Sequence, residues 1–186
     1  GALSRRAVLG GFALTASAAA GYAVFRPPFD LWPSFDELRA DFRTRTGQQK
    51  QLALSGDVSV RLNTQTSLAL RSSGEFTDRI ELIAGEASFT APKASRHSRV
   101  VLAASGATTA NGARFNMRRD DTSVCVTCLE GDIRVERQGR VVLAGPGQQV
   151  RYDDSGLEPA ITIDPELVVA WQEGALIFRM TPLREV

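Results

Sequence analysis

Histidine and cysteine are scarce in this sequence, whose 186 residues include one histidine and two cysteines. The histidine, His97, stands beside serines in the polar segment 95–99, but the members of a catalytic triad meet through the fold and are seldom neighbours in sequence. A structural zinc site usually takes four cysteine or histidine ligands, more than the chain holds. We therefore expect no enzymatic activity, no metal site and no bound cofactor.

The sequence also lacks an excess of charge of either sign. Its formal net charge is +1, with 23% charged and 43% hydrophobic residues. A nucleic-acid-binding surface needs clustered basic residues, and a disordered chain has too few apolar ones to form a core. We expect a folded domain and no nucleic-acid partner. Because the chain starts without methionine and the segment 181–186 closes no element, we also expect a piece of a longer protein.

Charge is entirely absent from one stretch, residues 7–25, which lies between Arg6 and Arg26. A helix rises about 1.5 Å per residue, so these nineteen residues span about 28 Å, close to the hydrocarbon thickness of a bilayer. We interpret residues 7–25 as a single transmembrane helix and residues 1–6 as its truncated cytoplasmic flank. The chain would then sit in the inner membrane, with the residues after Phe25 in the periplasm.

The alternative to a retained helix is a cleaved signal peptide, because residues 16–20 are small and resemble a cleavage site. The apolar character continues to Phe25, which is longer than a typical secretory core. Arg5 and Arg6 favour a cytoplasmic N-terminus, and with the apolar residues after them they also resemble a twin-arginine export signal.

Residues 26–45 read as a juxtamembrane linker and a short helix. The linker is rich in proline and aromatic residues. Ser34 and Glu37 have the spacing of a capping box, and this predicts a helix over 35–43.

Between residues 46 and 163 the apolar residues alternate with polar ones, as in strands with one buried face. Glycine- or asparagine-containing turns separate most of the segments, which recur every 8–12 residues without a helical pattern between them. We expect an all-β, antiparallel domain, built as a sandwich, roll or short solenoid. The predicted strands lie near 52–54, 58–62, 67–71, 79–83, 87–90, 99–102, 113–117, 123–127, 132–136, 141–143 and 149–152.

Residues 164–186 are expected to form a second short helix and the start of a truncated C-terminal module. Asp164 is a suitable N-cap, Pro165 suits the first helical position, and Gly174 is a suitable stop. The apolar residues of this region are candidates for a partner-binding surface, although closing the core of the β domain is the alternative that we favour for Trp171. They are Trp171, Leu176, Phe178 and Leu183.

Cys125 and Cys128 have the spacing of a redox motif but fall within a predicted strand. Residues three apart on a strand point to opposite faces, with Cα atoms about 10 Å apart, too far for a disulfide. We expect two separate, buried and unreactive thiols.

The sequence resembles the FecR domain over nearly all of the part after the apolar run. No block is distinctive alone, and their order along the chain carries the resemblance. The blocks are Thr44-x-x-Gly47, Leu54, Val60-Arg-Leu-Asn63 with Ser67, Arg79-x-x-x-Leu82-x-x-Gly85-Glu86-Ala87-x-Phe89, Gly112–Met117, Leu129-Glu130-Gly131-x-Ile133-x-Val135, Leu143-x-x-Gly145-x-Gly147-Gln148-Gln149-Val150, and Ala170-Trp171-x-x-Gly174-x-Leu176-x-Phe178-x-x-x-Pro182-Leu183.

The resemblance implies a membrane-spanning anti-sigma regulator. Its periplasmic part would contact the signalling domain of a TonB-dependent outer-membrane transporter of iron siderophores. A cytoplasmic domain before Gly1 would hold an extracytoplasmic-function sigma factor. The alternative is a membrane-tethered β domain that binds cell-wall or surface polysaccharide, since such domains also occur without a sigma factor.

One residue departs from the family pattern with a chemical consequence. Some members are said to cut themselves between a glycine and a threonine, in a step where the threonine hydroxyl attacks the preceding carbonyl. The corresponding step here is Gly112-Ala113, and alanine has no hydroxyl. We therefore expect no self-cleavage.

Overall fold

The computed structural model describes residues 39–54, 58–72, 78–91, 93, 99–110 and 112–174. The contacts of the chain divide it into two units, Gly1–Arg39 and Ala40–Val186, and nearly all the described residues belong to the second. The expected cytoplasmic flank and transmembrane helix (residues 1–25) lie outside the described residues, as do the export arginines Arg5 and Arg6. In the part that the structure describes, no helix is both long enough and apolar enough to cross a bilayer.

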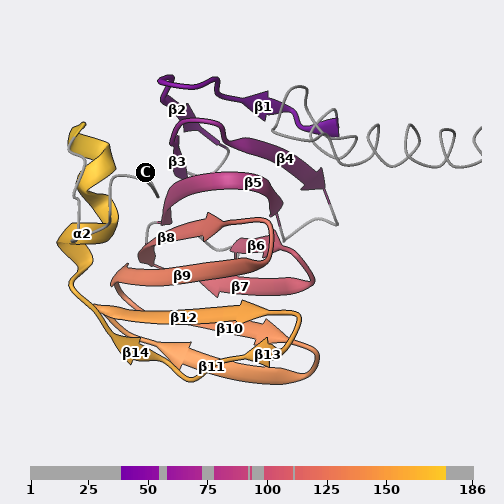
Figure 1. Ribbon diagram of the computed structural model, residues 1–186, viewed down its shortest axis with the longest axis vertical. Coiled ribbons are helices and arrows are strands. Elements are labelled where there is room, and N and C mark those ends of the chain that lie inside the picture. Colours follow the sequence, from indigo (N-terminus) through magenta and orange to yellow (C-terminus); the bar gives the residue numbers. More distant parts are fainter. Residues whose placement is uncertain are drawn as a thin grey trace, which may run out of the picture. The chain divides into compact units, whose positions relative to one another are not determined.

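The second unit is built mainly of β-strands, as the alternation predicts (Figure 1). The described residues form fourteen strands and one short helical segment near the end. The strands are β1 (Phe42–Arg43), β2 (Lys50–Ala53), β3 (Ser59–Leu62), β4 (Ser67–Ser72), β5 (Asp78–Ala91), β6 (Arg99–Ala103), β7 (Gly106–Ala110), β8 (Ala113–Arg119), β9 (Ser123–Glu130), β10 (Ile133–Arg137), β11 (Arg140–Ala144), β12 (Gln148–Asp153), β13 (Gly156–Leu157) and β14 (Ile161–Thr162).

The long strand β5 belongs to two halves of one continuous sheet. Its first part pairs with β4 and β6, and from β6 the order continues through β7 and β10 to β11. Its second part pairs with β3 and β8, and from β8 the order continues through β9 to β12. The sheet folds back on itself, so that β12 of one half lies near β6 of the other. The hydroxyl of Tyr152 on β12 donates a hydrogen bond to the carbonyl of Ala103 at the end of β6 (3.0 Å). The result is a barrel-like, mostly antiparallel sheet.

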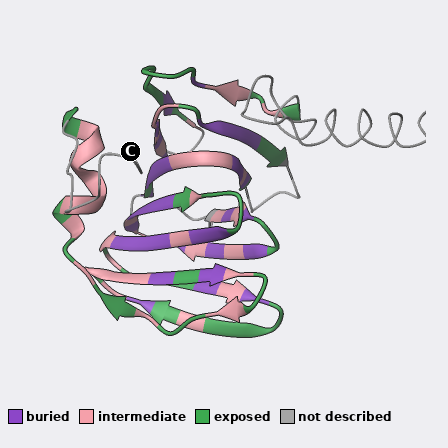
Figure 2. Ribbon diagram, in the orientation of Figure 1, coloured by how far each residue is buried: buried purple, intermediate pink, exposed green. Residues whose placement is uncertain are grey.

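A single apolar core fills the space between the two halves. Successive residues of a strand point to opposite faces, and in strands such as β3, β7 and β10 every second residue is buried. Figure 2 shows buried residues along most of the longer strands. Phe89 of β5 and Phe115 of β8 lie directly opposite each other and stack, with ring centroids 5.1 Å apart. Burying one such side chain contributes roughly 1.5–3 kcal/mol. The largest fully buried side chains are those of Tyr152, Phe89, Phe115, Leu62, Leu68, Ile80, Leu82, Met117, Ile133, Val60, Val101 and Val124.

The structure corrects the prediction of two separate strands at 79–83 and 87–90, because β5 runs through both. The sequence Gly85-Glu86 reads as a turn, but here Gly85 has φ +86° and carries β5 from one half of the sheet to the other. A Cβ atom at Gly85 would lie 2.6 Å from the carbonyl oxygen of Gln65, so only glycine fits this position.

The pairing of β5 with β6 is parallel, which differs from the expected all-antiparallel order. Arg79 lies opposite Val100, and Glu81 lies opposite Leu102. A parallel pair needs a long crossover connection. The second part of β5, in the other half of the sheet, supplies much of that crossover. Alternation carries no signal for strand direction.

The predicted helix over 35–43 is wrong at its C-terminal end. Phe42 and Arg43 form strand β1, which pairs with Leu68 and Ser67 of β4, while residues 35–38 lie outside the described residues. The helical spacing of apolar residues is overridden by main-chain pairing with the exposed edge of β4. Strands β7, β13 and β14 were not predicted.

The helix near the C-terminal end is confirmed with its caps. The Asp164 side chain accepts a hydrogen bond from the backbone amide of Glu166 (3.1 Å), and Pro165 begins α2 (Pro165–Val169). A 3₁₀ helix, η3 (Ala170–Glu173), continues it, and Gly174 ends it with φ +74°.

Candidate functional site

Residues from four of the blocks that carry the FecR resemblance meet at Glu86. The Glu86 carboxylate accepts hydrogen bonds from the side-chain amides of Asn63 (2.9 Å) and Asn116 (2.7 Å). The backbone amide of Asn63 donates to the carbonyl of Glu86 (2.9 Å). The hydroxyl of Thr44 donates to the carbonyl of Asn63, which joins the segment before β2 to the same cluster.

Thr66 completes this network from the turn before β4. Its hydroxyl donates to the carbonyl of Glu86 (3.0 Å), and its backbone amide donates to the hydroxyl of Thr44 (2.9 Å). Thr66 is fully buried, and buried polar groups of this kind stabilise a fold only when they are paired. The network therefore fastens the N-terminal strands to β5 and β8, which is a structural role.

Burial raises the pKa of Glu86, while the hydrogen bonds from Asn116 and Asn63 and the charge of Arg118 oppose that rise. A group whose pKa is raised on folding stabilises the fold fully below its unfolded pKa, and this contribution is lost as pH rises through the folded pKa. Glutamine does not ionise, so we expect the free energy of unfolding of Glu86→Gln to lack this contribution to its pH dependence. The free energy of unfolding of the wild type, minus that of Glu86→Gln, should fall as pH rises from below about 4.5 toward neutrality.

Urea unfolding at a series of pH values measures this difference. Glu130→Gln is the matched control, because Glu130 is exposed and lies on the same face of the sheet in an ion pair with Arg114. If the free energy of unfolding of the wild type minus that of Glu86→Gln stays constant across the series, or rises with pH, the raised pKa of Glu86 is contradicted.

The Gly112-Ala113 step lies at the start of β8 and is closely packed. Gly112 has φ +68°, and Ala113 is only 3% exposed. Gly131 lies against this peptide bond, because a Cβ atom placed there would be 2.4 Å from the carbonyl oxygen of Gly112.

We predict that the wild-type chain stays intact at Gly112-Ala113 until a separate protease acts, since no hydroxyl is available to attack the Gly112 carbonyl. An immunoblot of membranes from cells producing the tagged whole protein measures this. A fragment whose N-terminus is Ala113 would refute the prediction. Ala113→Thr is the informative variant, because cleavage restored by that change alone would show that only the hydroxyl is missing.

Of the four residues proposed as an interaction surface, the structure describes Trp171 alone. Leu176, Phe178 and Leu183 lie outside the described residues. Trp171 is half-buried and is not part of the central core. Its carbonyl accepts a hydrogen bond from the side chain of Gln49 (2.8 Å).

The next carbonyl, that of Gln172, accepts a hydrogen bond from the guanidinium of Arg61 on β3 (3.2 Å). These two contacts place η3 beside β2 and β3, and α2 lies against β9 (Figure 1). Helix and tryptophan therefore pack on the outside of the sheet instead of closing its core.

The two cysteines are free and lie on opposite faces of β9, as predicted. Cys128 is fully buried in the core, and burial raises the pKa of its thiol to about 11. Cys125 is only half-buried, which corrects the expectation that both are buried. It faces outward between Arg118 of β8 and Arg151 of β12, and burial still raises its pKa.

The histidine considered in the sequence is not tested by the structure. His97 lies outside the described residues. Within the ranges that the structure describes, no group of three or more His, Cys, Asp or Glu side chains could hold a metal ion.

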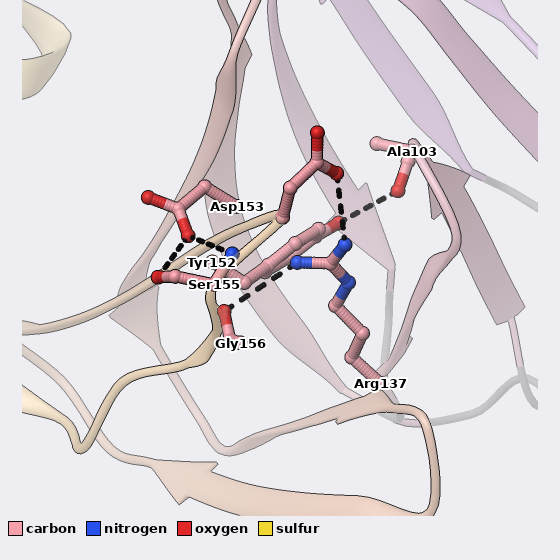
Figure 3. A network of polar contacts seen from close by, with 7 residues as sticks. Ala103, Arg137, Tyr152, Asp153, Ser155 and Gly156 are labelled. Atoms are coloured by element: carbon pink, nitrogen blue, oxygen red, sulfur yellow. Dashed lines mark hydrogen bonds and ion pairs between the residues drawn. The ribbon is translucent and has the colours of Figure 1, made fainter.

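A second polar cluster, at one end of the folded sheet, was not predicted (Figure 3). The guanidinium of Arg137 lies over the ring of Tyr152, 5.6 Å from its centroid. It also contacts the carboxylate of Asp154 (3.4 Å) and the carbonyl of Gly156 (3.5 Å). Because these residues meet only when the two halves of the sheet close, no spacing in the sequence reveals the cluster.

Comparison with known proteins places the chain in a family. The family model described as FecR protein matches residues 40–134. This match covers more than half of the chain, and the chain belongs to the FecR family.

Two crystal structures of a proposed anti-sigma factor from Parabacteroides distasonis ATCC 8503 share the fold. One is 23% identical, with a TM-score of 0.67, and the other is 25% identical, with a TM-score of 0.64. Each alignment covers 77% of this chain and 69% of the other. A search of curated proteins found no match.

Proposed function

We propose that this chain is the sensor part of a membrane-spanning anti-sigma regulator. The observation that carries the proposal is the FecR family match over residues 40–134, together with the fold shared with a protein described as an anti-sigma factor. The apolar run at 7–25 supports a single membrane pass, with the β domain in the periplasm and the N-terminus in the cytoplasm.

The proposed input comes from the signalling domain of a TonB-dependent outer-membrane transporter that imports iron siderophores. The proposed output is the release of an extracytoplasmic-function sigma factor, held by a cytoplasmic domain that precedes Gly1 in the whole protein.

The proposed contact surface is the C-terminal segment from Trp171 through Leu176 and Phe178 to Leu183. In support, the indole nitrogen of Trp171 is buried and has no hydrogen-bond partner among the described residues. Aromatic residues with one polar atom are frequent at protein interfaces.

Affinity capture tests this proposal. The tagged chain would be incubated with the signalling domain of the TonB-dependent receptor encoded beside its gene. We expect saturable binding, weakened at least about tenfold by Trp171→Ala, as for a residue at the centre of an interface. Leu143→Ala is the matched control, because Leu143 is a large apolar residue that is 70% exposed on β11. Equal capture by the two variants would contradict the proposed surface, and no capture by the wild type would contradict the proposed partner.

A further inference from the structure

A groove opens at one end of the folded sheet, beside the turn between β6 and β7. Its volume is about 480 Å³, within the usual range of small-ligand sites. Arg119, Arg137, Glu81 and Glu136 supply its charged lining, and Ala104–Gly106 form the turn at its edge. This end groove contains none of the residues assigned to the proposed function.

The two arginines of the end groove are available to an anion. The guanidinium of Arg119 donates to the carbonyl of Leu82 (3.1 Å) and has no carboxylate partner among the described residues. Arg137 is only 5% exposed, yet its one carboxylate contact is Asp154, whose side chain is fully exposed. The Nε atom of Arg137 is buried and has no hydrogen-bond partner in the described part of the chain.

The two carboxylates of the end groove are already neutralised. Glu81 pairs with Arg71 (2.9 Å), and Glu136 pairs with Arg134. Neither Arg71 nor Arg134 lines the groove. The groove therefore holds one guanidinium, that of Arg119, without a carboxylate partner among the described residues, in a partly enclosed place where a charge-assisted hydrogen bond is strong.

The backbone around the end groove is held in an unusual conformation. In the described residues, four positions other than glycine have positive φ, and three of them line this groove: Ala104 (+41°), Ser105 (+48°) and Gln138 (+49°). These residues form the two-residue hairpin turns between β6 and β7 and between β10 and β11, which require positive φ, so two tight turns shape this end of the groove.

The Tyr152 ring helps to hold that turn. Its hydroxyl donates to the carbonyl of Ala103 (Figure 3). A Cβ atom at Gly106 would lie 2.5 Å from the ring. Both arginines also lie near this ring, since their charges oppose the rise in the Tyr152 pKa that burial causes. The tyrosine thus fixes the turn and the guanidinium of Arg137 relative to one another.

We propose that the end groove binds a carboxylate group, held by the guanidinium groups of Arg119 and Arg137. A planar guanidinium matches a carboxylate in geometry, and a single negative charge is tolerated beside Glu81 and Glu136 better than a doubly charged phosphate. The carboxylate belongs either to a small organic acid or to an acidic side chain of a partner protein.

Titration of the ¹⁵N-labelled chain, followed by NMR, tests this inference. Succinate is the small-acid probe, and a blocked Ala-Asp-Ala peptide is the protein-like probe. We expect at least one of them to shift the amide signals of Ala104 and Ser105 and the Nε–H signal of Arg137, saturating with a dissociation constant of about 1 mM. The probe with the lower dissociation constant identifies the source of the carboxylate. Absence of shifts with both probes would overturn the proposal.

Matched controls separate recognition of a carboxylate from general electrostatic attraction. Arg119→Gln should weaken binding about tenfold, as expected for the loss of one charge-assisted hydrogen bond. Arg151→Gln removes the same charge from an exposed position, where Arg151 pairs with Glu158 and neither residue lines the groove, and it should leave binding unchanged. Succinamide and the blocked Ala-Asn-Ala peptide should shift none of these signals, and inorganic phosphate should bind more weakly than succinate.

The proposal is wrong if the neutral probes bind equally, if phosphate binds more tightly, or if Arg119→Gln and Arg151→Gln behave alike. If Arg119→Gln does not fold, Arg119→Lys replaces it. Lysine keeps the positive charge but lacks the planar pair of N–H donors that matches a carboxylate, so binding should still weaken.

Discussion

Replacing Gly85 with alanine is expected to lower the free energy of unfolding by about 3–5 kcal/mol, a large part of the 5–15 kcal/mol typical of a domain. Two effects add. A residue with a Cβ atom at φ +86° costs roughly 1–2 kcal/mol. The new methyl group would also lie 2.6 Å from the carbonyl oxygen of Gln65 and the hydroxyl of Thr66, which forces the turn before β4 to move.

Urea unfolding, followed by circular dichroism, measures this change. Gly139→Ala is the matched control, because Gly139 has φ +78° but no atom within 4 Å of an added Cβ. That variant should lose only the backbone contribution, about 1–2 kcal/mol. Equal losses for the two variants would show that β5 does not bend tightly against the Gln65 turn.

Replacing Leu14 with arginine is expected to impair membrane insertion. A charge near the centre of the apolar run costs roughly 2.5–3.5 kcal/mol, which lowers the inserted fraction about a hundredfold at equilibrium. Fractionation of cells that produce the whole protein measures the result, with carbonate extraction of the membranes.

Leu3→Arg is the control for this second prediction, since it adds the same charge outside the run. It should leave the protein in the membrane. A wild-type protein that fractionates as soluble with residues 7–25 intact would contradict the transmembrane interpretation. A mature N-terminus that follows Ala18 or Ala20 would contradict it equally.

Local patterns predicted most of the longer strands and the late helix. Alternation in 58–62 and 123–127 reports one buried face, and the caps Asp164 and Gly174 act on their own helix. These features depend on neighbours within a few residues, so the local sequence is enough to predict them.

Features that depend on distant partners could not be predicted in this way. The segment 35–43 has helical spacing, but Phe42 and Arg43 pair with β4, which lies beyond β2 and β3 along the chain. The parallel pairing of β5 with β6 depends on the bend at Gly85, which alternation does not show.

The candidate sites show the same division. Asn63, Glu86 and Asn116 belong to blocks that are weak singly, and only the fold shows that they form one network. The end groove requires Arg119 and Arg137 from different halves of the sheet, so neither residue stands out in the sequence.

The most direct test of the proposed anti-sigma role is capture of the whole protein from detergent-solubilised membranes of its own cells, with bound proteins identified by mass spectrometry. We expect an extracytoplasmic-function sigma factor to co-purify with the protein and to be absent from a capture with the tag alone. Growth with an imported iron siderophore should reduce the amount of bound sigma factor. Capture of the intact protein without any sigma factor, but with cell-wall or surface polysaccharide, would contradict the anti-sigma role and support a tethered binding domain.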